Sequence, residues 1–263
     1  MAPKGLKKLL KDTAPCKLTG SGENKRFQTV DGAGGSDAHT GRRVVLKGVT
    51  KRLQSKVFSD GFMPHVARTS DAPAGGHWRG PGGGRRRGAA VDAQCSRLAG
   101  LTPEKRYHSR MLALTRNVFA TLAARGLEPV AGQRGVCSVR HRIGTAADIV
   151  CYDPTNHHLI IVELKCGHNG SRTAAAQLDG GAQKMRVPLH KALDNTINRH
   201  LSQLAVTHHL FVREKLTLQK LGNLGVSGVS GLLMYANDSG VDCYPLVSWW
   251  MQKAPKILEA MRT

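Results

Sequence analysis

The sequence predicts an α/β (α+β) protein in which helices flank a mixed central β-sheet. Two hydrophobic strands joined by a polar turn lie in residues 143–167, and segments with apolar side chains at helical spacing lie on either side of them. A second pair of strands and a last helix follow in residues 226–261. The resulting order of a helix, three strands, a helix, two strands and a helix fits a mixed sheet covered by helices.

The first helix is expected over residues 102–125. Thr102 is placed to cap it, Pro103 stands at the first helical position, and Glu104 lies in the first turn. Gly126 is expected to end it. Its apolar stripe consists of Tyr107, Met111, Leu114, Val118 and Leu122.

Three strands are expected next. Residues 128–139 are predicted to hold the first, with a turn at Gly132-Gln133-Arg134-Gly135. The other two form a hairpin within residues 143–167, closed by the turn Asp153-Pro154-Thr155-Asn156.

Charged side chains stand in the apolar middle of this hairpin. Alternation places Glu163 and Lys165 on one face of the second strand, and folding at the turn brings Asp148 of the first strand close to them. Such groups are costly to bury unless something binds them. Carboxylate and carbonyl oxygens are the ligands that Mg²⁺ and Mn²⁺ prefer, so Asp148, Glu163 and the backbone carbonyl of Leu164 are candidate metal ligands.

This arrangement resembles the PD-(D/E)xK nuclease superfamily, in which an Asp in one strand and a (Asp/Glu)-x-Lys in the next form a metal-dependent phosphodiesterase centre. Asp148, Glu163 and Lys165 match the three residues, and Ala147 stands where a proline is usual. The resemblance implies a restriction-endonuclease-like core within residues 89–263, a Mg²⁺ or Mn²⁺ cofactor, and catalytic roles for the three matching residues.

The resemblance also implies further site members. Several branches, notably the RecB-like and phage-exonuclease-like ones, carry a glutamine on the helix after the lysine strand. Gln203 resembles it, with Gln177 as its rival, although Thr207 stands where a tyrosine is expected. A helix before the hairpin often contributes an acid, for which Glu104 is the candidate; a partner for the helix dipole is the alternative. The role of Asp92, as a helix cap or as a further acid near the site, is left open.

Basic residues downstream of the hairpin are candidate contacts to a phosphate backbone. Residues 167–186 form a Gly-rich, basic segment, and a second long helix is expected over roughly 189–211. An ordinary solvent-exposed surface is the alternative for both. The candidates are Arg172, Lys184, Arg186 and Arg199.

The C-terminal part is predicted to complete the core. Residues 232–236 and 241–246 are expected to form strands around the turn Asn237-Asp238-Ser239-Gly240, followed by a helix over about 247–261. Trp249 and Trp250 at the start of this helix are expected to be core residues.

Residues 1–88 differ from the rest and are predicted to be a largely disordered, basic, Gly-rich extension. Short apolar runs at 6–11 and 42–47 are expected to be locally ordered but too short to build a core. The formal net charge of +21 favours a polyanionic partner, and Arg85, Arg86 and Arg87 are candidate phosphate contacts. DNA is the expected partner and RNA an alternative, whereas no apolar run is long enough to span a membrane.

The six cysteines contain no Cys-x-x-Cys pair, which argues against zinc and favours a reducing, intracellular compartment. The arginine run is compatible with import into the nucleus, and a viral factory is the matching viral location. The N-terminal amphipathic stretch leaves a mitochondrial presequence as a minority alternative.

Together these features predict a metal-dependent nuclease that hydrolyses DNA in replication, recombination or repair, in a cell or a virus. One alternative is a non-enzymatic nucleic-acid-binding or packaging protein on a degenerate nuclease scaffold. The other is a nuclease that cleaves RNA with the same centre.

Overall fold

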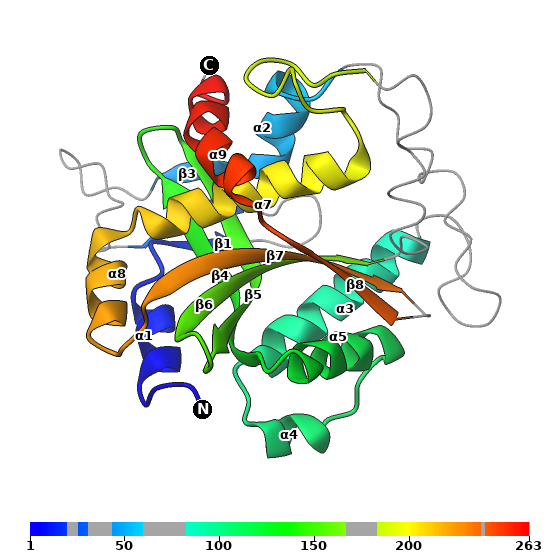
Figure 1. The fold of residues 1–263 in the computed structure, drawn as a ribbon, viewed down its shortest axis with the longest axis vertical. Helices are drawn as coiled ribbons and strands as arrows, with labels where there is room; N and C mark the ends of the chain where they lie inside the picture. Colours follow the sequence, from blue (N-terminus) through cyan, green and yellow to red (C-terminus); the bar gives the residue numbers. More distant parts are fainter. Residues whose placement is uncertain (20–25, 31–43, 60–82, 167–182, 238–239, 263) are drawn as a thin grey trace.

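A mixed β-sheet of eight strands forms the centre of the protein in the computed structural model, and helices pack on both of its faces (Figure 1). The predicted fold class is therefore confirmed. The structure describes residues 1–19, 26–30, 44–59, 83–166, 183–237 and 240–262. Within these ranges, no helix has both the length and the apolar composition needed to cross a membrane.

The sheet is organised around β5 (Ile143–Asp153), which pairs antiparallel with both β4 (Glu128–Ser138) and β6 (His158–Cys166). β6 runs parallel to β7 (Gly228–Asn237), which pairs antiparallel with β8 (Gly240–Pro245). β5 and β6 contribute buried residues to the apolar clusters on both faces of the sheet, which explains their nearly continuous apolar sequences.

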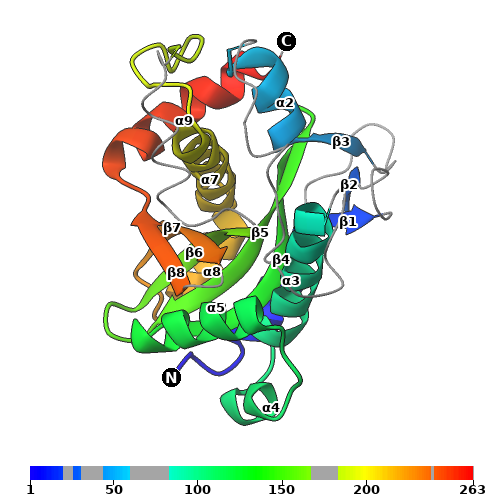
Figure 2. The same ribbon diagram turned by 90° about the vertical axis from the view of Figure 1, so that its right-hand side faces the viewer.

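Helices cover both faces of the sheet (Figure 2). α7 (Thr196–Val212) and α9 (Ser248–Ala260) pack on one face, within the larger of two buried apolar clusters. α3 (Gly83–Ala99) and α5 (Ala113–Ala124) pack on the opposite face, within the smaller cluster. The central hairpin of the sheet is thus enclosed from both sides.

The predicted hairpin is confirmed. The Asp153 carboxylate accepts hydrogen bonds from the backbone N–H groups of Thr155, at 2.9 Å, and Asn156, at 3.2 Å, which fixes the turn. Antiparallel pairing then runs from Asp153 opposite His158 to Ile149 opposite Val162, where it stops.

The turn predicted at Gly132-Gln133-Arg134-Gly135 is wrong, because β4 continues through it. The two glycines serve close packing instead. A Cβ atom at Gly132 would lie 2.4 Å from the Cα of Ser96 in α3, and one at Gly135 would lie 2.1 Å from the carbonyl oxygen of Cys16. Gly132 and Gly135 therefore let two other segments approach β4 closely.

The helix predicted over residues 102–125 is two helices, α4 (Pro103–Tyr107) and α5. The Thr102 hydroxyl caps α4 as expected, by accepting a hydrogen bond from the backbone N–H of Lys105. Tyr107 does not join the apolar stripe, since the chain leaves the helix there and the side chain is 85% exposed.

The C-terminal predictions are confirmed by β7, β8 and α9. Trp250 is buried, and Trp249 packs against the same cluster. The second long helix begins at Thr196 rather than near 189, because the Asn195 side chain caps it by accepting the backbone N–H of Asn198 at 2.8 Å. A further short helix, α8 (Lys215–Gly222), follows it and was not expected.

The prediction of a largely disordered extension is wrong for the described part of residues 1–88. This part forms two helices, three strands and the start of α3. The elements are α1 (Leu6–Asp12), β1 (Cys16–Thr19), β2 (Arg26–Thr29), β3 (Val45–Gly48) and α2 (Val49–Lys56).

These N-terminal elements are part of the same core. β3 pairs in parallel with β5, so that the β1-β2-β3 segment extends the central sheet. Leu6 and Leu10 of α1 and Leu53 of α2 are buried in the larger cluster. The short apolar runs fail to build a core alone, but they complete a core that the rest of the chain supplies. The boundary predicted at 88/89 falls inside α3.

Candidate active site

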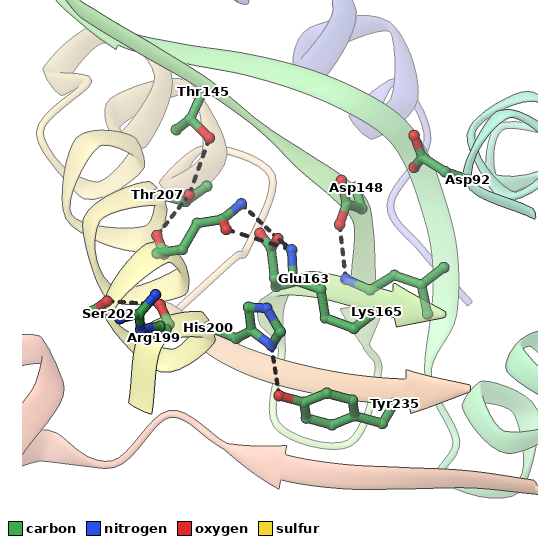
Figure 3. Close-up of polar contacts among 12 residues, drawn as sticks. Asp92, Thr145, Asp148, Glu163, Lys165, Arg199, His200, Ser202, Thr207 and Tyr235 are labelled. Carbon is green, nitrogen blue, oxygen red and sulfur yellow. Dashed lines mark hydrogen bonds and ion pairs between the residues drawn. The ribbon is translucent and has the colours of Figure 1, made fainter. Parts of the chain in front are cut away.

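The charged residues of the hairpin lie where β5 and β6 separate (Figure 3). Extending the register beyond Ile149 and Val162 would place Asp148 opposite Glu163, but the ladder has ended there. The Asp148 carboxylate instead accepts the backbone N–H of Leu164 at 2.8 Å. A side chain thus replaces the backbone partner that β6 loses.

The same geometry directs a backbone oxygen into this gap. A strand residue points its N–H and C=O groups to the same side of the strand. Because the N–H of Leu164 points to Asp148, its carbonyl oxygen lies on the Asp148 side of β6. This is consistent with its expected role as a metal ligand.

Glu163 is the most buried member of the site, with 1% of its surface exposed. Its Oε1 accepts hydrogen bonds from the Lys165 ammonium and from the Gln203 amide, the latter at 2.7 Å. Lys165 Nζ also lies 3.4 Å from Gln203 Oε1. The other carboxylate oxygen, Oε2, is inaccessible to solvent and has no hydrogen-bond partner among the described residues.

Gln203 is held in place by the helix that carries it. Its backbone carbonyl accepts a hydrogen bond from the Thr207 hydroxyl at 3.0 Å, and that hydroxyl lies 3.5 Å from the hydroxyl of Thr145 on β5. Thr207, where the resembling branches carry a tyrosine, therefore links α7 to the strand of Asp148 (Figure 3). The structure brings Gln203 to the site, whereas Gln177 lies outside the described residues.

A third acid approaches the site from the opposite face of the sheet. Asp92 of α3 is joined to Asp148 through Gln133, whose amide nitrogen lies 2.8 Å from Asp92 Oδ1 and 3.4 Å from Asp148 Oδ1. Gln133 itself was missed, because the surrounding glycines were interpreted as a turn. Its positive φ of 48° is the local irregularity that accompanies its position in the middle of β4.

Asp92 takes the position that was expected for Glu104. Glu104 is exposed on α4, where its own backbone N–H and the Thr102 hydroxyl lower its pKa by hydrogen bonding. Glu104 forms its hydrogen bonds at the N-terminus of α4. The expectation that it joins the site is wrong. The acid comes from α3, the helix that packs against β4, β5 and β6.

Burial and mutual repulsion perturb the ionisation of this cluster. Burial raises the pKa of Asp148 well above its usual value, and the negative charges of Glu163 and Asp92 raise it further. Burial also raises the pKa of Glu163, against the opposing effect of Lys165. Burial alone would lower the pKa of Lys165, but Glu163 and Asp148 hold it above its usual value. One ammonium group therefore offsets only part of the negative charge.

These residues fit a divalent cation. Glu163 Oε2 is a buried acceptor without a partner in the described chain, and Asp148, Glu163 and the Leu164 carbonyl supply oxygen ligands of the kind that Mg²⁺ and Mn²⁺ take. In the described ranges, no three His, Cys, Asp or Glu side chains converge closely enough to form a complete metal cage. Mg²⁺ usually keeps several waters and few protein ligands, so a partial set is sufficient for it.

A histidine–tyrosine pair beside the site was also missed. His200, one turn before Gln203 on α7, has its Nδ1 2.6 Å from the hydroxyl of Tyr235, which is the neighbour of Lys165 in the β6–β7 ladder (Figure 3). Tyr235 is buried, and its burial together with the charges of Tyr244 and Glu163 raises its pKa. Only the helical spacing of His200 from Gln203 is visible in the sequence.

The candidate phosphate contacts have different positions. Arg199 is not available, because its guanidinium binds Asp194, with Nε 2.5 Å from Oδ1, and stacks on Phe58. Arg186 donates to the carbonyl of Ser55 at 3.2 Å, and Lys184 is exposed.

On α3, Arg86 is exposed, and Arg87 is close enough to Cys166 at the end of β6 to lower the pKa of its thiol, against the raising effects of burial and the nearby acids. The side chain of Arg85 and the whole of Arg172 lie outside what the structure describes.

Comparisons with known proteins give no relative for this chain. No protein-family model matches it, and neither a search of curated proteins nor a search of solved structures finds a match. No comparison therefore bears on the resemblance to the nuclease superfamily, which rests on the matching residues Asp148, Glu163 and Lys165.

Proposed function

We propose that the protein is a metal-dependent nuclease that hydrolyses phosphodiester bonds of DNA. The observation that carries this proposal is the Glu163 side chain, buried beside Asp148 and Lys165, with one oxygen held by two donors and the other without a partner in the described chain. Burying a carboxylate oxygen without a partner is costly, which argues against a purely structural ion pair. An oxygen without a partner beside a second carboxylate suits a bound cation.

Each residue has a distinct task in the proposed reaction. Asp148, Glu163 and the Leu164 carbonyl hold the metal ion, and Asp92 adds negative charge behind them. When bound, Mg²⁺ or Mn²⁺ supplies charge stabilisation for a phosphate and a nucleophile that is active at neutral pH. The Lys165 ammonium places positive charge where negative charge develops on the phosphate oxygens. Gln203 keeps Glu163 Oε1 and Lys165 in position.

DNA is the proposed substrate because the chain is strongly basic around an acidic centre. The acids occupy a small gap, whereas the chain carries a formal net charge of +21. Cations outside the site attract the phosphate backbone, and the acids inside it bind the metal ion. The proposed biological role is the processing of DNA in replication, recombination or repair, in the nucleus or in a viral factory. RNA remains the second substrate to test.

The direct test is cleavage of labelled linear and circular DNA and of RNA in Mg²⁺, in Mn²⁺ and in EDTA. Wild type is expected to cut only with a metal ion, and Lys165→Ala to lose about 100-fold or more, as for other groups that stabilise transition-state charge. Lys215→Ala, on the exposed side of α8, is the control and should cut like wild type. Sparing of circles would indicate an exonuclease.

A second outcome would contradict the nuclease proposal. If wild type binds DNA but cuts no substrate with either metal ion, the nuclease proposal falls, and the protein is a non-enzymatic nucleic-acid-binding protein.

A further inference from the structure

A basic groove lies next to the acidic gap, on the β4 side. Its floor is the middle of β4, and its walls are α1 with the start of β1 on one side and the end of α3 on the other. It encloses a cavity of about 880 Å³. The functional residues assigned above do not use it, apart from Gln133.

The walls of this groove carry positive charge. Lys8, Lys11, Lys17 and Arg97 are exposed on it, and no ion pair within the described ranges neutralises them. Among the described residues that line the groove, Asp12 carries the one carboxylate. A concave surface with several cations and one anion concentrates a polyanion.

Two close backbone contacts and one hydrogen bond from a lysine side chain hold the walls of the groove together. Gly132 lets the Ser96 backbone of α3 approach β4, and Gly135 does the same for the Cys16 backbone of β1. Lys7 donates to the carbonyl of Gly100 at 3.5 Å, which joins α1 to the end of α3. The groove is therefore preformed, so that a ligand does not have to order it.

The groove leads to the candidate active site through a single side chain. Gln133 lines the groove, and its amide nitrogen contacts both Asp92 and Asp148. The Gln133 side chain therefore stands between the groove and the Asp148 carboxylate.

We infer that this groove binds the phosphate backbone of a single nucleic-acid strand and guides it to the site; the guiding role rests on the proposed nuclease function, and the binding role does not. The cavity of about 880 Å³ is of the size that takes small ligands, about 300–1,000 Å³, which favours one strand over a duplex. No aromatic side chain is among the described residues that line it, so the strand is held by its phosphates and not by base stacking.

The test measures binding without catalysis. Full-length Glu163→Gln protein is titrated with labelled oligothymidine in EDTA at several salt concentrations. The groove variant adds Lys8→Gln, Lys11→Gln and Lys17→Gln. The control adds Lys51→Gln, Lys215→Gln and Lys256→Gln, exposed lysines of α2, α8 and α9 with the same total charge change. Equal unfolding temperatures of the two variants establish that both are folded.

In the groove variant, log K should fall less steeply with log salt. The slope should become less negative by about 2, since each phosphate contact to a single strand contributes about −0.7. The control should change the slope much less. If the groove variant and the control changed the salt slope equally, the groove proposal would be overturned, because only the net charge of the protein would then matter. The proposal would also be overturned if duplex DNA bound through the groove as tightly as single strands do.

The guiding role is tested separately, with Glu163 restored. The groove variant should raise the KM for a single-stranded substrate and leave kcat unchanged. Suppose that wild type does not cleave, but the groove variant still shows the weaker salt dependence of binding. The binding role of the groove is then supported, and the nuclease proposal fails. If wild type cleaves and the groove variant binds and cleaves like the control, the groove proposal fails and the nuclease stands.

Discussion

At the scale of single residues, the site is defined by what each oxygen of Glu163 contacts. Oε1 is held by Lys165 and Gln203, and Oε2 has no partner in the described chain. Leaving a buried polar atom unsatisfied costs about 1–3 kcal/mol, and more for a charged one. Residues that carry such a cost in a well-packed protein are expected to recover it when a ligand binds.

Gln203 is expected to act by positioning Glu163. Gln203→Ala removes the 2.7 Å hydrogen bond to Oε1 and should raise the Mn²⁺ concentration for half-maximal cleavage by about 10–100-fold, as for other groups that orient a metal ligand. Gln219→Ala, exposed on α8, is the matched control. A fall in kcat with no change in the Mn²⁺ midpoint would argue against the positioning role.

His208 on α7 gives the protein a predicted pH dependence of stability. Its Nε2 lies 3.1 Å from the carbonyl oxygen of Val229, and burial lowers the pKa of the imidazole. The unfolded state, with a pKa near 6.5, takes up a proton before the folded state does, so stability is lost as pH falls below about 6.5.

Urea unfolding of wild type and His208→Gln between pH 7.5 and about 5 checks this prediction. The difference in unfolding free energy between the two proteins should shift in favour of the variant as pH falls. A difference that is constant with pH would show that His208 is not held neutral by the fold.

At the scale of helices and strands, the correct predictions concern features that a local sequence pattern determines. The 143–167 hairpin followed from strand alternation and from Asp153 in the turn, and α7 was expected with Gln203 on it. Contacts between distant segments were missed. Gly132 and Gly135 look like turn residues, but Ser96 and Cys16 decide their role.

For a similar reason Glu104 was named as the candidate acid, while the role of Asp92 was left open. Both are single acids on helices before the hairpin, and only the packing of α3 on β4, β5 and β6 distinguishes them. The N-terminal segment was misjudged because its apolar residues are sparse. Leu6 and Leu10 need the core of the rest of the chain to be buried.

Whether α1 packs as part of the hydrophobic core can be tested by truncating one of its buried side chains. Leu10 is fully buried, so Leu10→Ala should lower the free energy of unfolding by about 2–5 kcal/mol. Val45→Ala, at a 53% exposed position of β3, should cost well under 1 kcal/mol. Equal, small effects in urea unfolding would mean that α1 is not part of the core in solution.

At the scale of the whole molecule, opposite charges are separated. The acids gather in the gap between β5 and β6, and cations line the neighbouring groove and the exposed surface of α3. For the proposed nuclease, this separation serves to attract phosphates broadly and to hold a metal ion at one place. The account therefore depends first on whether the acidic gap binds a divalent cation.

Mn²⁺ binding to the full-length protein, measured by calorimetry without nucleic acid, tests this claim most directly. Wild type is expected to bind Mn²⁺, and Asp148→Asn, which keeps the shape of the side chain and removes its charge, to lose that binding while remaining folded. Saturable binding in wild type that Asp148→Asn abolishes would support the site. Absence of binding in wild type, or equal binding by both proteins, would contradict it.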